Sequence, residues 1–103
     1  MNRIEQLLQF LKENPKDNFV RHSLALEYIK LGDDLKARIL FEEILNDSPE
    51  YIGSYYHLAK LLERQNQIDL ATEWYEKGMA AAKKANDMRS YNELQAAYED
   101  LIY

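Results

Sequence analysis

Two matching stretches decide the fold of this chain: LALEYIKLG at residues 24–32 and LAKLLERQN at residues 58–66. The first is followed by an A-x-x-x-F pattern at 37–41 and the second by A-x-x-x-Y at 71–75, so that matching residues lie 34 positions apart. A fixed period of this length is typical of proteins built from repeated helix–turn–helix units. The sequence therefore predicts an all-α fold with two copies of one unit at its centre.

The repeated positions divide into small residues where helices cross, larger residues that fill the space beside them, and turn residues. These structural positions are Leu24, Ala25, Tyr28, Gly32, Ala37, Phe41, Pro49, Leu58, Ala59, Leu62, Ala71 and Tyr75. Gly32 ends the first helix of its unit because it adopts a left-handed backbone without steric cost, and Asn66 tolerates the same conformation. We expect Ala25→Leu to overpack the helix crossing and to cost about 1–3 kcal/mol of stability, which a thermal melt would measure.

The residues before the first repeat form half of another unit. Apolar residues recur at helical spacing in this segment, at Ile4, Leu7, Leu8 and Leu11. Pro15 ends this first helix near Asn14 and lies 34 residues before Pro49. The segment is therefore interpreted as the second helix of a repeat whose first helix is missing.

Polar residues mark where the helices of the repeats begin. Asp17 or Asn18 is predicted to cap the first helix of the first repeat, and Asp33 to cap its partner. Ser48 is expected to cap the next helix, with proline at the first helical position. The body of this helix is expected at residues 51–64.

The last segment departs from the 34-residue register. A partner helix is expected from Ile68 to about Ala85, ended by the Asn86-Asp87 pair. The C-terminal helix that follows is amphipathic, with Ser90 and Glu93 forming a predicted capping box. One of its faces carries Tyr91, Leu94, Tyr98 and Leu101. We interpret it as a helix that covers the open end of the repeat array, as such arrays require.

These residues and spacings resemble the tetratricopeptide repeat family, most specifically from Asn18 to about Lys84. The resemblance implies an all-α fold in which antiparallel helix–turn–helix repeats stack into a short right-handed α-solenoid of about six helices. The expected single domain, 1–103, consists of a half-repeat helix at 1–15, repeats at 18–51 and 52–85, and a capping helix at 87–103.

Composition excludes several classes of function. The net charge of −5 argues against binding to nucleic acid or to anionic membranes, which basic proteins favour. No cysteine is present, so disulfides and thiolate chemistry are excluded. The chain lacks an apolar run of the roughly 20 residues that span a membrane, and its start lacks the pattern of a signal peptide. These features predict a cytoplasmic protein.

The family resemblance implies an adaptor or scaffold that holds a peptide segment of a partner protein in a concave groove. Transferred position by position, the groove is lined by Phe19, His22, Ser23, Leu26, Ile29, Tyr56, His57, Lys60 and Glu63. The family's carboxylate clamp is not carried over, because His22 and Leu26 stand where that clamp has Lys and Asn.

The charges of the two lining helices indicate the chemistry of the partner. These helices carry a net charge of +2, from Arg21, Lys30, Lys60 and Arg64 against Glu27 and Glu63. A mildly basic, aromatic groove on an acidic protein favours an acidic segment or a C-terminal carboxylate.

Two other functions are weighed against the adaptor. The tyrosine-rich C-terminal helix, including Tyr91, Tyr98 and Tyr103, could pair across a two-fold axis, which would make the chain a structural protein acting as a homodimer. We expect a monomer or a weak homodimer. Enzymatic activity is not expected. The only histidines, His22 and His57, lack ligand-spaced partners, and no phosphate loop or catalytic set is recognisable. No metal or cofactor is therefore predicted.

Overall fold

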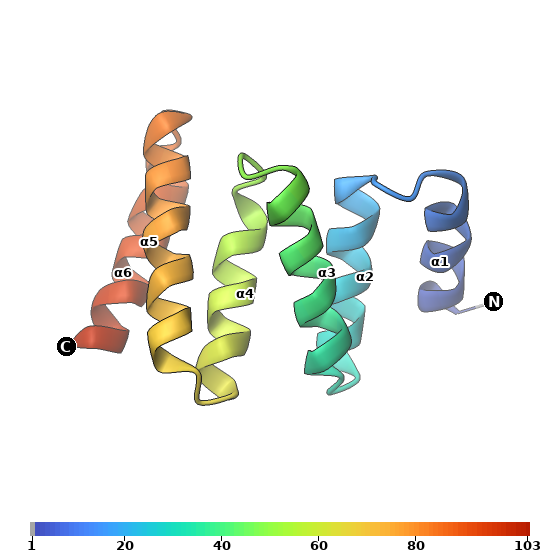
Figure 1. Cartoon of the computed structure of the whole chain (residues 1–103), viewed down its shortest axis with the longest axis horizontal. Coiled ribbons are helices and arrows are strands. Elements are labelled where there is room, and N and C mark those ends of the chain that lie inside the picture. The colour runs from blue at the N-terminus through green and yellow to red at the C-terminus, as the bar shows by residue number, and fades with distance from the viewer. Residues whose placement is uncertain (1) are drawn as a thin grey trace. The chain divides into compact units, whose positions relative to one another are not determined.

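A computed structural model describes residues 2–103, and these residues form six α-helices joined by short turns (Figure 1). The helices are α1 (Arg3–Glu13), α2 (Asn18–Lys30), α3 (Asp34–Asp47), α4 (Gly53–Arg64), α5 (Ile68–Lys84) and α6 (Met88–Ile102). The chain divides into two compact units, Met1–Ser48 and Pro49–Tyr103, which are described separately below. The all-α class predicted from the sequence is confirmed.

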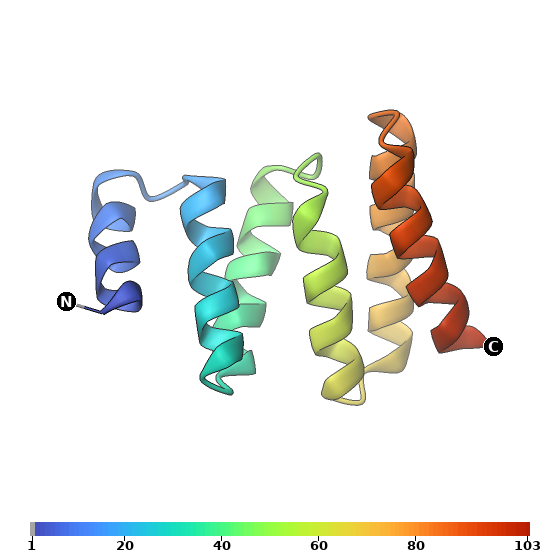
Figure 2. The same cartoon turned by 180° about the vertical axis from the view of Figure 1, so that it is seen from behind.

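The first unit contains α1, α2 and α3. Helices α2 and α3 form an antiparallel hairpin, and α1 packs against α2 (Figures 1 and 2). Ala25 of α2 and Ala37 of α3 have no exposed surface, which lets the two helices approach closely. Phe41 is likewise fully buried, and Leu7 of α1 adds a buried side chain at the N-terminal end.

The second unit is organised around α5, which packs against both α4 and α6 (Figure 2). Ala59 and Ala71 are fully buried, as the equivalent alanines of the first unit are. Gly78 permits a close approach between helices in this unit. A Cβ atom at this position would lie 2.7 Å from Tyr55 Cβ and 3.1 Å from Leu94 Cδ1. The missing side chain at Gly78 thus provides the space in which α4, α5 and α6 meet.

Three helices end in the same left-handed turn. The backbone φ angle is 79° at Gly32, 61° at Asn66 and 58° at Asn86. After each of these residues, the next backbone N–H donates to a carbonyl five residues earlier: Asp33 to Tyr28, Gln67 to Leu62, and Asp87 to Ala82. This is the Schellman arrangement, which satisfies carbonyl groups that the end of a helix would leave unpaired.

The beginnings of α2, α3 and α5 agree with the sequence, and α5 starts at Ile68 as expected. The Asp17 side chain accepts a hydrogen bond from the Val20 N–H, 3.0 Å away, and Asp33 accepts one from the Lys36 N–H. The predicted start of the next helix is wrong, because α4 begins at Gly53 without a side-chain cap.

Tertiary hydrogen bonds explain the later start of α4. The Ser48 hydroxyl, expected to cap that helix, instead accepts a hydrogen bond from the Asn18 amide at 2.9 Å and lies at the end of α3. The Pro49 carbonyl accepts a hydrogen bond from the Tyr55 hydroxyl at 2.5 Å. Ser48 and Pro49 are therefore both held by hydrogen bonds outside a helical turn, and α4 starts only after them.

The capping residue of α6 is also different from the one predicted. The Asp87 carboxylate accepts hydrogen bonds from both the backbone N–H and the hydroxyl of Ser90, at 3.1 and 2.8 Å. These bonds lower the pKa of Asp87. Ser90 therefore lies inside the first turn and does not cap the helix, and Glu93 pairs with Arg89 instead of closing a capping box.

No helix within residues 2–103 combines the length and the apolar character that crossing a membrane would require.

Candidate partner-binding surfaces

Helix α4 carries the first candidate surface, opposite its buried side. Leu58, Ala59 and Leu62 are fully buried. The four residues that the sequence assigns to the groove from this helix are the partly exposed ones: Tyr56, His57, Lys60 and Glu63. Tyr56 has 36% of its surface exposed. The helical spacing of these side chains gives α4 one buried face and one face available to a partner.

A connected set of polar contacts runs across this face of α4. The Lys60 ammonium lies 5.8 Å from the centroid of the Tyr56 ring, within reach of a cation–π interaction. The same ammonium lies 3.7 Å from Oε2 of Glu63. That carboxylate also accepts a hydrogen bond from the hydroxyl of Tyr75, a fully buried residue of α5. A core residue therefore contacts a charged residue of the candidate surface.

Burial sets the protonation of two groups near this surface. It raises the pKa of Tyr75 well above the ordinary value for a phenol, and the hydrogen bond to Glu63 adds to that effect. Tyr75 therefore stays neutral, and its hydroxyl donates a hydrogen bond to the Glu63 carboxylate. Burial also lowers the pKa of His57, with a further contribution from the positive charge of Arg64. The His57 imidazole, which lies edge-on to the Tyr56 ring at 5.7 Å, is therefore neutral at pH 7.

Helix α2 carries the second candidate surface, which is mainly apolar. Phe19, at its N-terminal end, has 68% of its surface exposed. The remaining residues assigned to the groove from this helix are half-buried: His22, Ser23, Leu26 and Ile29. The His22 ring lies edge-on to Phe41, with 5.5 Å between ring centroids. This face offers apolar and aromatic contacts and one imidazole.

The two surfaces differ at matched repeat positions. Where α4 has Lys60 and Glu63, α2 has Leu26 and Ile29 in the 34-residue register. Tyr75, whose hydroxyl reaches Glu63, corresponds to Phe41, which has no hydroxyl. The hydroxyl and the carboxylate that it contacts are thus both present in one repeat and both absent from the other.

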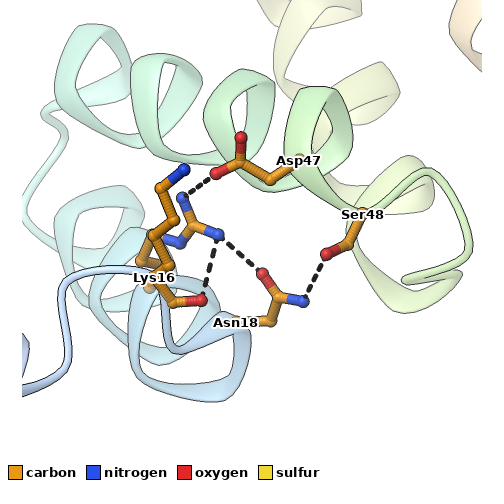
Figure 3. Close-up of polar contacts among 5 residues, drawn as sticks. Lys16, Asn18, Asp47 and Ser48 are labelled. Atoms are coloured by element: carbon orange, nitrogen blue, oxygen red, sulfur yellow. Dashed lines mark hydrogen bonds and ion pairs between the residues drawn. The ribbon is translucent and has the colours of Figure 1, made fainter.

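Arg21 does not contribute to the basic character expected of the lining helices. The residue is 3% exposed, and its guanidinium lies 2.9 Å from the Asp47 carboxylate, 2.7 Å from the Asn18 side-chain oxygen and 3.2 Å from the Lys16 carbonyl. Figure 3 shows Lys16, Asn18 and Asp47 converging on this guanidinium, with Ser48 bonded to Asn18. The bond to Arg21 lowers the pKa of Asp47.

This cluster corrects the charge assigned to the α2 surface. The sequence places Arg21 among the charges of the lining helices, but the residue is buried. Lys30 of the same helix forms an ion pair with Glu27 at 3.0 Å. On α4, Lys60 is likewise paired, with Glu63 at 3.7 Å.

Helix α6 uses most of its apolar face within the second unit. Leu94 and Ala97 are buried, and the Tyr98 hydroxyl lies 3.4 Å from the Glu76 carboxylate of α5. Burial, together with Glu76, raises the pKa of Tyr98. Of the tyrosines considered for self-association, Tyr103 is the most exposed, at 96%. The surface available on α6 for pairing with a second copy is therefore smaller than the sequence suggests.

Two further features concern small ligands. A pocket of about 460 Å³ lies against α1, lined by Gln6, Gln9, Phe10 and Glu13. The sequence did not predict it, because these residues lie outside the apolar positions that identify the helix. Among residues 2–103, no three or more His, Asp or Glu side chains are grouped so that they could hold a metal ion.

Two solved structures that resemble this chain are tetratricopeptide repeat domains. A tetratricopeptide repeat domain protein from Salinibacter ruber is 38% identical, with a TM-score of 0.82, and the match covers 85% of this chain and 89% of that one. The TPR2B domain of yeast Sti1, solved in a complex with pHsp70, is 16% identical but has a TM-score of 0.87, with 95% of this chain and 78% of that one covered. The second likeness shows the fold alone.

Curated sequences give more distant matches. The mouse aspartyl/asparaginyl beta-hydroxylase is 26% identical over 84 residues, which is 82% of this chain. The chain spans between 11% and 24% of the length of the curated mouse relatives that it matches. No family model matches the chain.

Proposed function

Because this chain belongs to the tetratricopeptide repeat family, we propose that it is an adaptor that binds a peptide segment of a partner protein, with the exposed face of α4 as the main contact surface and that of α2 as a separate one. Its structural neighbours support a role in protein interaction in general. The yeast domain that shares this fold was solved in a complex, which supports a protein or peptide as the partner. The residues that make contact are the specific part of the proposal.

The observation that carries this proposal is the exposed aromatic and cationic pair on α4. Tyr56 and Lys60 lie next to each other on a helix whose other face is fully buried. A tyrosine ring supplies a large contact area at a small cost in conformational entropy, and the lysine supplies a charge for recognition. The match to the mouse hydroxylase does not change this proposal, since it covers only 11% of that protein.

The chemistry of each face indicates what it would bind. Lys60 and Arg64 favour an acidic segment or a C-terminal carboxylate on α4, since opposite charges steer association and select the partner. Phe19, Leu26 and Ile29 favour apolar side chains on α2. Contact surfaces of this size on single helices are small, so we expect a dissociation constant of roughly micromolar order.

A paired affinity capture from lysate of the source cells tests the proposal. One bait is the wild-type protein and the other carries Tyr56→Ala and Lys60→Ala. A third bait, Lys84→Ala with Tyr103→Ala, removes the same two residue types from exposed positions outside α2 and α4. All three baits should have the same melting temperature, because the changed side chains are not part of the buried core.

The proposal expects a protein that is retained by the wild type and by the third bait but lost from the α4 variant. Direct binding of the captured protein, measured with purified components by calorimetry, would then give the affinity. Equal retention by all three baits would mean that the partner binds elsewhere and would contradict the assignment of α4.

A further inference from the structure

Lys60 is the central charge of the α4 surface, and an intramolecular carboxylate competes for it. Its ammonium lies 3.7 Å from Oε2 of Glu63. The Lys60 side chain has 37% of its surface exposed, so a carboxylate of a partner can reach it. Binding of such a carboxylate must overcome the attraction of Lys60 to Glu63, which is of the size typical for exposed ion pairs. The strength of the Lys60–Glu63 pair therefore sets how available Lys60 is.

Tyr75 controls the same carboxylate from the core side. Its hydroxyl donates to Oε2 of Glu63, the same oxygen that faces Lys60. The two donors thus share one acceptor atom. A hydrogen bond to a charged group is among the stronger ones in proteins. Glu63 is therefore held toward α5, and Lys60 remains at 3.7 Å instead of at the shorter distance of a direct hydrogen bond.

The first repeat shows that this contact is not needed for packing. Phe41, at the position of Tyr75, is fully buried without a hydroxyl, and Ile29 stands at the position of Glu63. The fold of a repeat thus accommodates phenylalanine at this site. The tyrosine and the glutamate occur together in the repeat whose first helix also carries Lys60.

From these contacts we infer that Tyr75 is a positioning residue that sets the preference of the α4 face for carboxylates, acting through Glu63 on Lys60. The inference rests on the proposed function of α4 and extends it to Tyr75, which is fully buried and so out of reach of a partner. Loss of the Tyr75 hydroxyl would release Glu63 to pair fully with Lys60 and so weaken binding of an acidic segment. Loss of the Glu63 charge would release Lys60 from its ion pair and so strengthen binding of an acidic segment.

A double-mutant cycle tests this inference, with wild type, Tyr75→Phe, Glu63→Gln and the double variant. The acidic probe is an eight-residue peptide of alternating leucine and glutamate with a free C-terminus. The control probe has glutamine for glutamate and an amidated C-terminus. Fluorescence anisotropy gives the dissociation constants, and NMR of labelled lysine gives the chemical shift of the Lys60 side chain without peptide.

Tyr75→Phe should weaken binding of the acidic peptide by about two- to fivefold, the range expected from changes in one exposed ion pair. Glu63→Gln should strengthen it by a similar factor, and the double variant should match Glu63→Gln alone. The control peptide should bind all four proteins equally. The Lys60 shift should change in Tyr75→Phe but should not differ between Glu63→Gln and the double variant.

Separate results would overturn the inference and the proposed function. A wild type that prefers the acidic peptide, with no effect of Tyr75→Phe on affinity or on the Lys60 shift, would overturn the inference alone. A Lys60 shift that follows the predicted pattern, in a wild type that binds neither peptide, would support the positioning role and remove the assigned peptide site. An effect of Tyr75→Phe that persists beside Glu63→Gln would show that the hydroxyl does not act through Glu63.

Discussion

At the scale of single residues, stability depends on small side chains where helices meet. Gly78 is the sharpest case, because a Cβ atom there would lie 2.7 Å from Tyr55 Cβ. We predict that Gly78→Ala destabilises the protein by about 1–3 kcal/mol, as overpacking of a core does. Helix propensity alone predicts the opposite sign, a gain of about 1 kcal/mol. Urea unfolding monitored by circular dichroism distinguishes the two.

A control on the same helix calibrates this prediction. Ala80 is exposed, so Ala80→Gly should show the propensity effect without a packing effect, a loss of about 1 kcal/mol. A Gly78→Ala variant that is more stable than the wild type would contradict the close approach of α4, α5 and α6.

The Arg21–Asp47 contact should make stability depend on pH. The pKa of Asp47 is lowered in the folded state from its ordinary value of 3.8 by the bond to Arg21. The unfolded state therefore binds more protons in this range, and the stabilising effect is present above about pH 3.8 and lost as pH falls through the folded pKa. We predict that Asp47→Asn reduces the loss of stability between pH 5 and pH 3.

Denaturant unfolding at several pH values would measure this effect. Glu43→Gln, which removes an exposed carboxylate from the same helix, is the matched control and should leave the pH dependence close to that of the wild type. Equal pH profiles for Asp47→Asn and the wild type would show that the ion pair with Arg21 contributes nothing to acid stability.

Residue roles were predictable from the sequence where they follow from periodicity. The alanines and the large apolar residues at repeated positions could be assigned to the helix crossings because the 34-residue period sets their spacing. The roles of Arg21 and Tyr75 could not, since the carboxylates that they contact, Asp47 and Glu63, lie 26 and 12 residues away and no local pattern links them. Such contacts depend on tertiary packing.

At the scale of elements, the left-handed turns determine where the first helices of the repeats end. Gly32 adopts its φ of 79° without strain, whereas Asn66 adopts 61° at some cost. We predict that Gly32→Ala destabilises the protein by about 1–2 kcal/mol and that Asn66→Gly changes stability by less than about 1 kcal/mol. Thermal melts of both variants would measure this, and a neutral Gly32→Ala would contradict the left-handed turn.

Helix ends were predictable where a local signal decides them. Asp17 and Asp33 cap helices as their positions suggest, because the cap is a contact three residues along the chain. The start of α4 was not predictable from the Ser-Pro pair, because Ser48 and the Pro49 carbonyl bond to Asn18 and Tyr55 instead. A strong local signal can thus be overruled by hydrogen bonds that only the folded chain makes.

At the scale of the whole molecule, self-association is the alternative to partner binding. The apolar face of α6 packs on α5 within one unit, and Tyr98 contacts Glu76. We therefore predict a monomer whose mass in light scattering does not change with protein concentration. A mass that doubles with concentration, and that Tyr103→Ala restores to the monomer, would favour the structural role considered from the sequence.

The fold class could be predicted from the sequence, whereas the chemistry of the binding faces could be predicted only in part. The repeat period and the helix-ending residues are sufficient to specify six helices in the order observed. The groove positions were expected from the family resemblance, but the charge of each face was not, because Arg21 is buried and both Lys30 and Lys60 are paired with glutamates. Ion pairs formed on folding decide which charges remain for a partner.

The central claim is that a partner segment binds the exposed face of α4. Mapping of backbone amide NMR shifts, during titration with the partner segment identified by affinity capture, tests it most directly. The account predicts that the largest shifts occur at Tyr56, His57, Lys60 and Glu63, with further shifts on the α2 face. Shifts confined to α3 or to the exposed side of α5 would contradict the account.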